Sequence, residues 1–174
     1  MSESLFEHLL VPPPRPALRF PGGELSYREL SSAVAATVLA LEGFGRVAVF
    51  AEPRLETALG VLSALVDGVE VVPINPKAGS LELEHIIKDS RPEALLAARQ
   101  AELPERLTVL KRIVVDPEAR FDRPPPARQV DDEPALILYT SGTTGPPKGA
   151  ILSSRSIASN LDALARVWHW TSDD

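Results

Sequence analysis

The chain has 174 residues and a formal net charge of −6, from 18 Lys and Arg against 24 Asp and Glu. This length predicts about one domain, and the acidic balance argues against a nucleic-acid partner, which needs a basic surface. No apolar run approaches the roughly 18 to 20 residues of a membrane span, and residues 1–8 are too acidic for a secretory signal. Cysteine is absent, which excludes disulfides and thiolate chemistry. We therefore expect a cytoplasmic protein without a membrane partner.

Helix-like and strand-like stretches alternate along the chain. In chain order the expected elements are a strand at 17–20, a helix from Ser26 to about Gly43, a strand at 46–50, a helix with Pro53 in its first turn, a strand at 69–74, a helix from Ser80 to about Arg91, strands at 94–97, 112–115 and 135–139, and a last helix capped by Ser153. The spacing of Ser26 and Glu29 is that of a capping box. In the last helix, Ile157, Leu161, Leu164 and Trp168 form an apolar stripe that we expect to pack in the core.

This order predicts an α/β fold with a largely parallel sheet and flanking helices. Ligands of such sheets gather at the carboxyl ends of the strands. Residues 116–134, rich in proline, aspartate and arginine, are expected to form an internal connection rather than regular structure.

The most unusual segment spans residues 140–149 and follows the apolar strand at 135–139. It combines hydroxyl side chains, glycines and a lysine within ten positions: Thr140, Ser141, Gly142, Thr143, Thr144, Gly145 and Lys148. Glycines let backbone amides approach a ligand closely, and consecutive amides in a turn form an anion-binding nest. The segment therefore predicts a phosphate loop that binds a polyphosphate.

This loop differs from the Walker A motif of P-loop NTPases. If Gly142 is taken as the first glycine of that motif, Pro147 stands where the second glycine belongs. Gly149 stands where the magnesium-binding Ser or Thr belongs. The sequence indicates a phosphate loop of another kind.

Residues 138–149 resemble the phosphate-loop signature of the adenylate-forming (AMP-binding, acyl-CoA synthetase) superfamily. Residues 25–30 and 71–76 are similar to other segments of these enzymes, so the resemblance runs from about Arg15 onward. It implies that the chain, 1–174, is the N-terminal portion of an AMP-binding domain and incomplete. Within the superfamily, residues 72–79 and 82–90 most resemble malonyl-CoA synthetases of actinobacterial type, which implies malonate or methylmalonate as the acid.

The resemblance also implies a reaction. A carboxylate attacks the α-phosphate of Mg-ATP, which gives an acyl-adenylate and pyrophosphate, and coenzyme A then displaces AMP. ATP, Mg²⁺ and coenzyme A are thus implied, and residues 140–145 would hold the β- and γ-phosphates while Lys148 neutralises their charge. The family's main catalytic lysine lies in a C-terminal domain and has no counterpart here, so no catalytic residue and no metal ligand is assigned in this chain.

Three alternatives follow from this resemblance. The first is a piece of an acid–thiol ligase that needs the remainder of the same enzyme as its partner and is inactive alone. The second is part of a peptide-synthetase adenylation domain, which passes the acyl group to a carrier protein. The third is a non-catalytic fragment that binds a nucleotide or another polypeptide. In each case we expect the fragment to expose sheet edges and apolar helix faces that the rest of a complete enzyme would cover.

Overall fold

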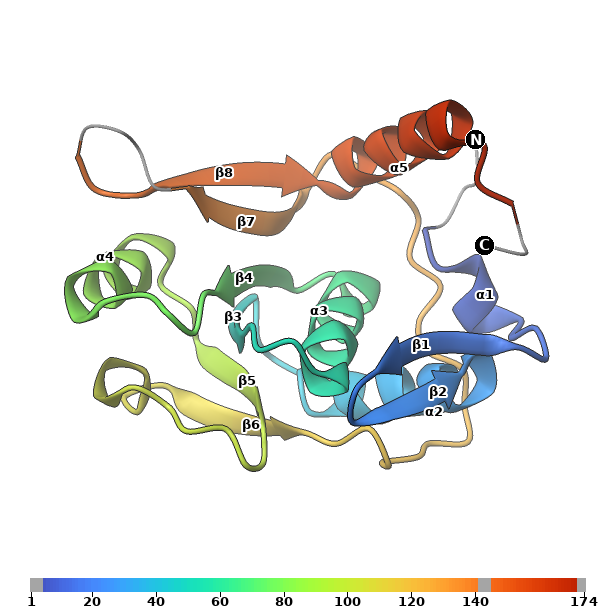
Figure 1. Ribbon diagram of the computed structural model, residues 1–174, viewed down its shortest axis with the longest axis horizontal. Helices are drawn as coiled ribbons and strands as arrows, with labels where there is room; N and C mark the ends of the chain where they lie inside the picture. The colour runs from blue at the N-terminus through green and yellow to red at the C-terminus, as the bar shows by residue number, and fades with distance from the viewer. Residues whose placement is uncertain (1–4, 141–144, 172–174) are drawn as a thin grey trace.

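The computed structural model describes residues 5–140 and 145–171 (Figure 1). Five of the six strands in its central sheet are parallel, which confirms the predicted α/β class. The elements are α1 (Glu7–Leu10), β1 (Pro16–Phe20), β2 (Gly23–Ser26), α2 (Tyr27–Leu39), β3 (Arg46–Phe50), α3 (Leu55–Asp67), β4 (Glu70–Ile74), α4 (Ser80–Ser90), β5 (Ala94–Ala98), the 3₁₀ turn η1 (Glu105–Leu107), β6 (Lys111–Val115), β7 (Pro134–Thr140), β8 (Lys148–Ser153) and α5 (Ser154–Trp168).

The strand order of the sheet is β6-β5-β3-β4-β7-β8, and β8 is antiparallel to β7 at one edge. Helices α2 and α3 pack on one face with Val49, Val71 and Leu96, and α4 with η1 packs on the other with Val72 and Leu95. Alternate residues of β3, β4 and β5 thus enter two separate cores. Burial on both faces explains why these strands appear in the sequence as continuous apolar runs.

Helix α2 begins with the predicted capping box. The Ser26 hydroxyl accepts a hydrogen bond from the Glu29 amide at 3.3 Å, and the Ser26 amide donates to the Glu29 carboxylate at 2.8 Å. Hydrogen bonds from the Ser26 hydroxyl and amide hold the pKa of the Glu29 carboxyl below its usual value. The box therefore stabilises the start of α2 above about pH 4 and is lost as the pH falls further.

We expect Ser26→Ala to lower the free energy of unfolding by about 1 kcal/mol, because the Glu29 amide loses the hydroxyl that accepts its hydrogen bond and the Glu29 carboxylate loses a hydroxyl donor. Ser26→Thr keeps the hydroxyl and serves as the control, with a loss of less than about half that amount. Urea unfolding at pH 7 measures both. Equal losses in the two variants would contradict the capping role.

The structure differs from the sequence prediction at five places. The strand at 17–20 exists, but it pairs antiparallel with β2 in a separate two-stranded sheet, outside the parallel one. Helix α1 and strands β2 and β8 were not predicted, because α1 and β2 have only four residues each and β8 begins inside the segment at 140–149. Pro53 precedes the cap of α3, Arg54, instead of lying in its first turn.

The expected core packing of the last helix is wrong. Ser153 caps α5 as predicted, and its side chain accepts a hydrogen bond from the Ser156 amide. The apolar stripe, however, is largely exposed: Leu161 is 44% and Trp168 60% exposed. Amphipathic spacing fixes which face of a helix is apolar, but only the surrounding structure decides whether that face is covered. In the part of the chain that the structure describes, no helix is long and apolar enough to cross a membrane.

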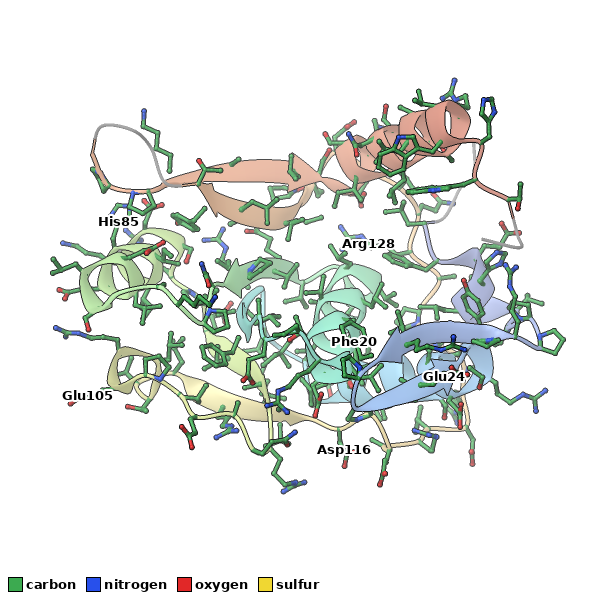
Figure 2. The ribbon with its side chains drawn as sticks, in the orientation of Figure 1. Phe20, Glu24, His85, Glu105, Asp116 and Arg128 are labelled. Carbon is green, nitrogen blue, oxygen red and sulfur yellow. The ribbon has the colours of Figure 1, made fainter. Side chains whose placement is uncertain are left out.

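Residues 116–133 carry no helix or strand and lead from β6 to β7. Polar contacts anchor their last part. Arg128 forms an ion pair with Asp131 at 3.1 Å, and the Ser154 hydroxyl at the start of α5 donates to the Asp131 carbonyl at 3.0 Å. Arg128 lies between the parallel sheet and α5 (Figure 2). The connection thereby fixes where β7 begins and, with it, where the segment at 140–149 leaves the sheet.

Candidate functional site

The segment at 140–149 joins β7 to β8 at the carboxyl edge of the parallel sheet. Strand β7 pairs with β4 at Leu136 and Val71. The chain leaves β3 toward α3 on one face and leaves β4 toward α4 on the other. In α/β sheets, ligands bind outside the carboxyl ends of strands whose connections diverge in this way. The segment follows β7, the strand next to β4.

The structure brings together the two ends of the predicted phosphate loop. Thr140 and Lys148 are register partners at the base of the β7–β8 hairpin, and both are exposed. Gly145 has a φ of +105°, and open space surrounds the position where a Cβ would stand. The remaining predicted residues, Ser141, Gly142, Thr143 and Thr144, lie outside the described residues.

Gly149 lets the hairpin close tightly behind the loop. It is the register partner of Tyr139, and a Cβ at this position would lie 3.2 Å from Tyr139 Cζ and 3.1 Å from Ile137 Cγ2. Both distances are shorter than ordinary carbon contacts, so a larger residue would push the tyrosine ring away. Glycine is needed here for close approach, not for an unusual backbone angle.

Three side chains that the sequence did not single out as a group meet beside the loop. His85 Nε2 donates to the Pro147 carbonyl at 2.8 Å, and the Tyr139 hydroxyl donates to Asp89 Oδ2 at 2.5 Å. The His85 and Tyr139 rings meet edge to face, with centroids 6.3 Å apart. His85 lies between α4 and the hairpin (Figure 2). The only sequence signal was the i, i+4 spacing of His85 and Asp89 on α4.

Burial, followed by the hydrogen bond to Asp89, raises the pKa of Tyr139 to about 12. Because the pKa of Tyr139 is higher in the folded protein than the value of 10 expected in the unfolded chain, the protonated hydroxyl contributes its full stabilisation below pH 10. That contribution is lost as the pH rises toward 12. We therefore expect the free energy of unfolding of the wild type to fall between pH 10 and 12 more steeply than that of Tyr139→Phe. Urea unfolding at several pH values measures the two slopes. Parallel slopes would contradict the hydrogen bond between Tyr139 and Asp89.

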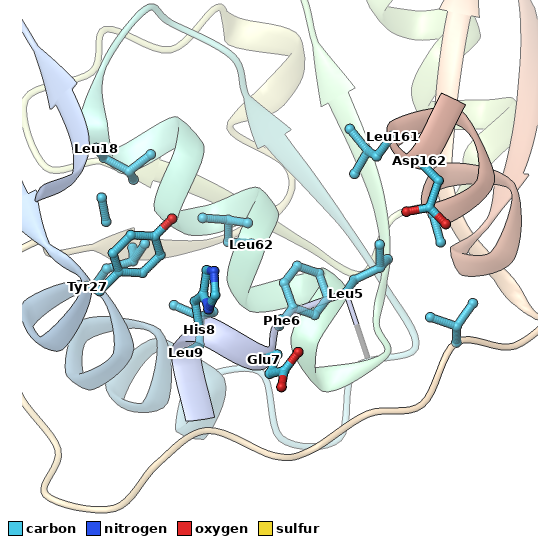
Figure 3. A pocket seen from close by; sticks show the side chains of 14 residues that line it. Leu5, Phe6, Glu7, His8, Leu9, Leu18, Tyr27, Leu62, Leu161 and Asp162 are labelled. Carbon is cyan, nitrogen blue, oxygen red and sulfur yellow. The ribbon is translucent and has the colours of Figure 1, made fainter. Parts of the chain in front are cut away.

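Two hollows lie away from the hairpin, and neither suits a polyphosphate. One, of about 870 Å³, lies beneath the β1–β2 hairpin and is lined by six carboxylates and two arginines, so its field repels anions. The other, of about 480 Å³, lies between α1, α2, α3 and α5 (Figure 3). Its walls are mostly apolar, with Phe6, Leu9, Leu18 and Leu62 among them.

Metal ligands do not gather in the described part of the chain. Within residues 5–140 and 145–171, no group of three or more His, Asp or Glu side chains could hold a metal ion. The three histidines serve other contacts: His8 packs against Tyr27, His85 bonds Pro147 and His169 ends α5 in a left-handed conformation.

The comparisons with known proteins agree on one family. The family model described as "AMP-binding enzyme" matches residues 5–174. A solved malonyl-CoA ligase, in a ternary product complex with methylmalonyl-CoA and AMP, is 49% identical over 95% of this chain and 36% of its own, with a TM-score of 0.87.

Two curated relatives also match most of this chain. The malonate–CoA ligase of Arabidopsis thaliana is 33% identical over 76% of this chain and 25% of its own length. Surfactin synthase subunit 3 of Bacillus subtilis (strain 168) is 36% identical over 83% of this chain and 12% of its own length. The chain thus spans about a third or less of these proteins.

Proposed function

Because the chain belongs to the AMP-binding enzyme family, we propose that it forms the ATP-phosphate-binding part of an acyl-CoA ligase. The observation that carries this proposal is the hairpin loop between Thr140 and Lys148, which leaves the carboxyl edge of the sheet next to β4. In its described limb, Gly145 has open space around it and Lys148 has an exposed side chain. These are the groups that a polyphosphate requires.

The loop's task in this proposal is electrostatic. When a carboxylate attacks the α-phosphate of ATP, negative charge moves onto the leaving pyrophosphate. We expect the amides and hydroxyls of residues 140–145 and the Lys148 ammonium group to stabilise that charge as it develops. We propose Mg²⁺ as the counterion of ATP.

We propose malonate or methylmalonate as the acid and coenzyme A as the acceptor. Two similarities support this choice: the solved malonyl-CoA ligase, which holds methylmalonyl-CoA and AMP, and the plant malonate–CoA ligase. A second candidate is part of a peptide-synthetase adenylation domain, with a carrier protein as the acceptor. The 36% identity to surfactin synthase subunit 3 favours it.

The proposed partner of these 174 residues is the polypeptide that corresponds to the rest of the ligase. The 36% coverage of the solved ligase and the exposed apolar face of α5 support a dependence on further protein. We therefore expect no turnover by residues 1–174 alone.

ATP–pyrophosphate exchange tests the proposal. It is measured on the complete product of the reading frame that contains the chain, with malonate, methylmalonate, acetate and a long-chain acid. We expect exchange with malonate or methylmalonate, followed by thioester formation when coenzyme A is added. Thioester formation only with a carrier protein would favour the second candidate, and absence of exchange with every acid would refute both. The same assay on residues 1–174 tests their expected inactivity.

A further inference from the structure

We propose that α4 clamps both limbs of the phosphate loop, with His85 as the positioning residue of the limb that ends in Lys148. The inference rests on the proposed function, because it assigns a device that shapes the ATP site. It names a role for side chains outside the loop itself, and it starts from the contact between His85 Nε2 and the Pro147 carbonyl.

The limb that ends in Lys148 lacks part of the usual backbone support. Pro146 and Pro147 have no amide hydrogen, so neither can donate to the neighbouring limb of the hairpin. Among the described residues, register pairing between β7 and β8 ends at Thr140 and Lys148. His85 supplies this limb with a support from outside the hairpin, through a hydrogen bond of 2.8 Å.

The other limb has its own contact with the same helix. Asp89 lies one turn after His85 on α4, and side chains at this spacing share a helix face. Its carboxylate accepts the Tyr139 hydroxyl hydrogen, one residue before the loop begins at Thr140. One face of α4 thus holds the strand that enters the loop and the segment that leaves it.

The rings and the backbone behind the loop make this clamp stiff. The His85 ring meets the Tyr139 ring edge to face, and Tyr139 in turn lies against the backbone of Gly149. A shift of His85 is therefore transmitted to residues on both sides of Lys148. Since catalysis by fixed dipoles depends on their being held before the reaction, loosening this limb should weaken ATP use in particular.

Three substitutions at His85 separate positioning from general stability. His85→Gln keeps an N–H donor at about the reach of Nε2, His85→Asn is too short to reach Pro147, and His85→Leu has no donor. In the complete reading-frame product we expect His85→Leu and His85→Asn to raise the KM for ATP about 10-fold, which corresponds to one lost hydrogen bond. The KM for the acid should change less than about 2-fold, and His85→Gln should recover most of the ATP affinity.

His8→Leu is the matched control, because it removes a histidine from α1, where the ring packs on Tyr27 away from the hairpin. An unchanged KM for ATP in His85→Leu would overturn the clamp. The clamp would also be overturned if His85→Leu raised the KM for ATP and the KM for the acid equally and lowered the melting temperature, because a merely structural residue has that effect.

A second measurement keeps the two proposals distinguishable. Amide hydrogen exchange in the same protein should become faster at Lys148 and Gly149 in His85→Leu and return to the wild-type rate in His85→Gln. This readout requires no turnover. If the wild type shows no ATP–pyrophosphate exchange with any of the acids, the proposed function fails. Unchanged amide hydrogen exchange in His85→Leu overturns the clamp itself.

Discussion

Lys148→Ala is expected to lower the ATP–pyrophosphate exchange rate of the complete reading-frame product about 100-fold, the size of effect seen when one fixed donor to a developing charge is removed. Lys148 is the first residue of β8 and the register partner of Thr140, so its backbone is held while its side chain is exposed. The loss should appear mainly in the kcat/KM for ATP, because the ammonium group acts on the phosphates and not on the acid.

Two variants sharpen this test. Lys148→Arg keeps the charge and should retain most of the exchange. Lys111→Ala removes the same charge from the amino end of β6, at the opposite edge of the sheet, where the ammonium group lies 5.1 Å from the Phe44 ring centroid. An unchanged exchange rate in Lys148→Ala, or an equal loss in Lys111→Ala, would contradict the assignment of Lys148 to the phosphates.

The fold was predictable where local signals agree. Both ends of the strand at 46–50 were predicted correctly. Both of its faces are buried, so every position is apolar except Arg46 at its start. Helix α2 was predictable from its cap, since Ser26 and Glu29 satisfy each other within one turn of chain. In both cases the information lies within a few consecutive residues.

The site was predictable in its residue types but not in its support. Glycines, hydroxyls and Lys148 mark a phosphate loop, yet β8 was not predicted because it begins inside that motif. The clamp was hidden for a different reason. His85 and Pro147 are 62 residues apart, and Asp89 and Tyr139 are 50 apart, so only the crossover from β4 through α4 brings them together. Such contacts depend on topology, which no local pattern encodes.

The same dependence on long-range contacts appears at the C-terminal end of α3. Gly68 has a φ of +81°, and a Cβ added there would lie 1.6 Å from Arg128 Nη1. Arg128 pairs with Asp131, whose pKa is lowered because hydrogen bonds from Ser154 and Arg128 outweigh the opposing effect of burial. This glycine therefore leaves room for the arginine that anchors the connection before β7.

Gly68→Ala is expected to lower the free energy of unfolding by about 3 kcal/mol. A left-handed conformation costs a non-glycine residue about 1 to 2 kcal/mol. Displacement of the Arg128 guanidinium adds the loss of its packing and of its contact with Asp131. Urea unfolding at pH 7 measures the change.

Gly43→Ala separates the two contributions. Gly43 has nearly the same φ, +86°, but nothing lies within 4 Å of an added Cβ, so only the conformational cost of about 1 kcal/mol should remain. The double variant Gly68→Ala, Arg128→Ala isolates the steric part. Its loss in free energy of unfolding should be about 1 kcal/mol smaller than the sum of the two single losses, because the clash is already relieved when Arg128 is removed. Additive losses, or equal losses at Gly43 and Gly68, would show that Arg128 does not depend on the glycine.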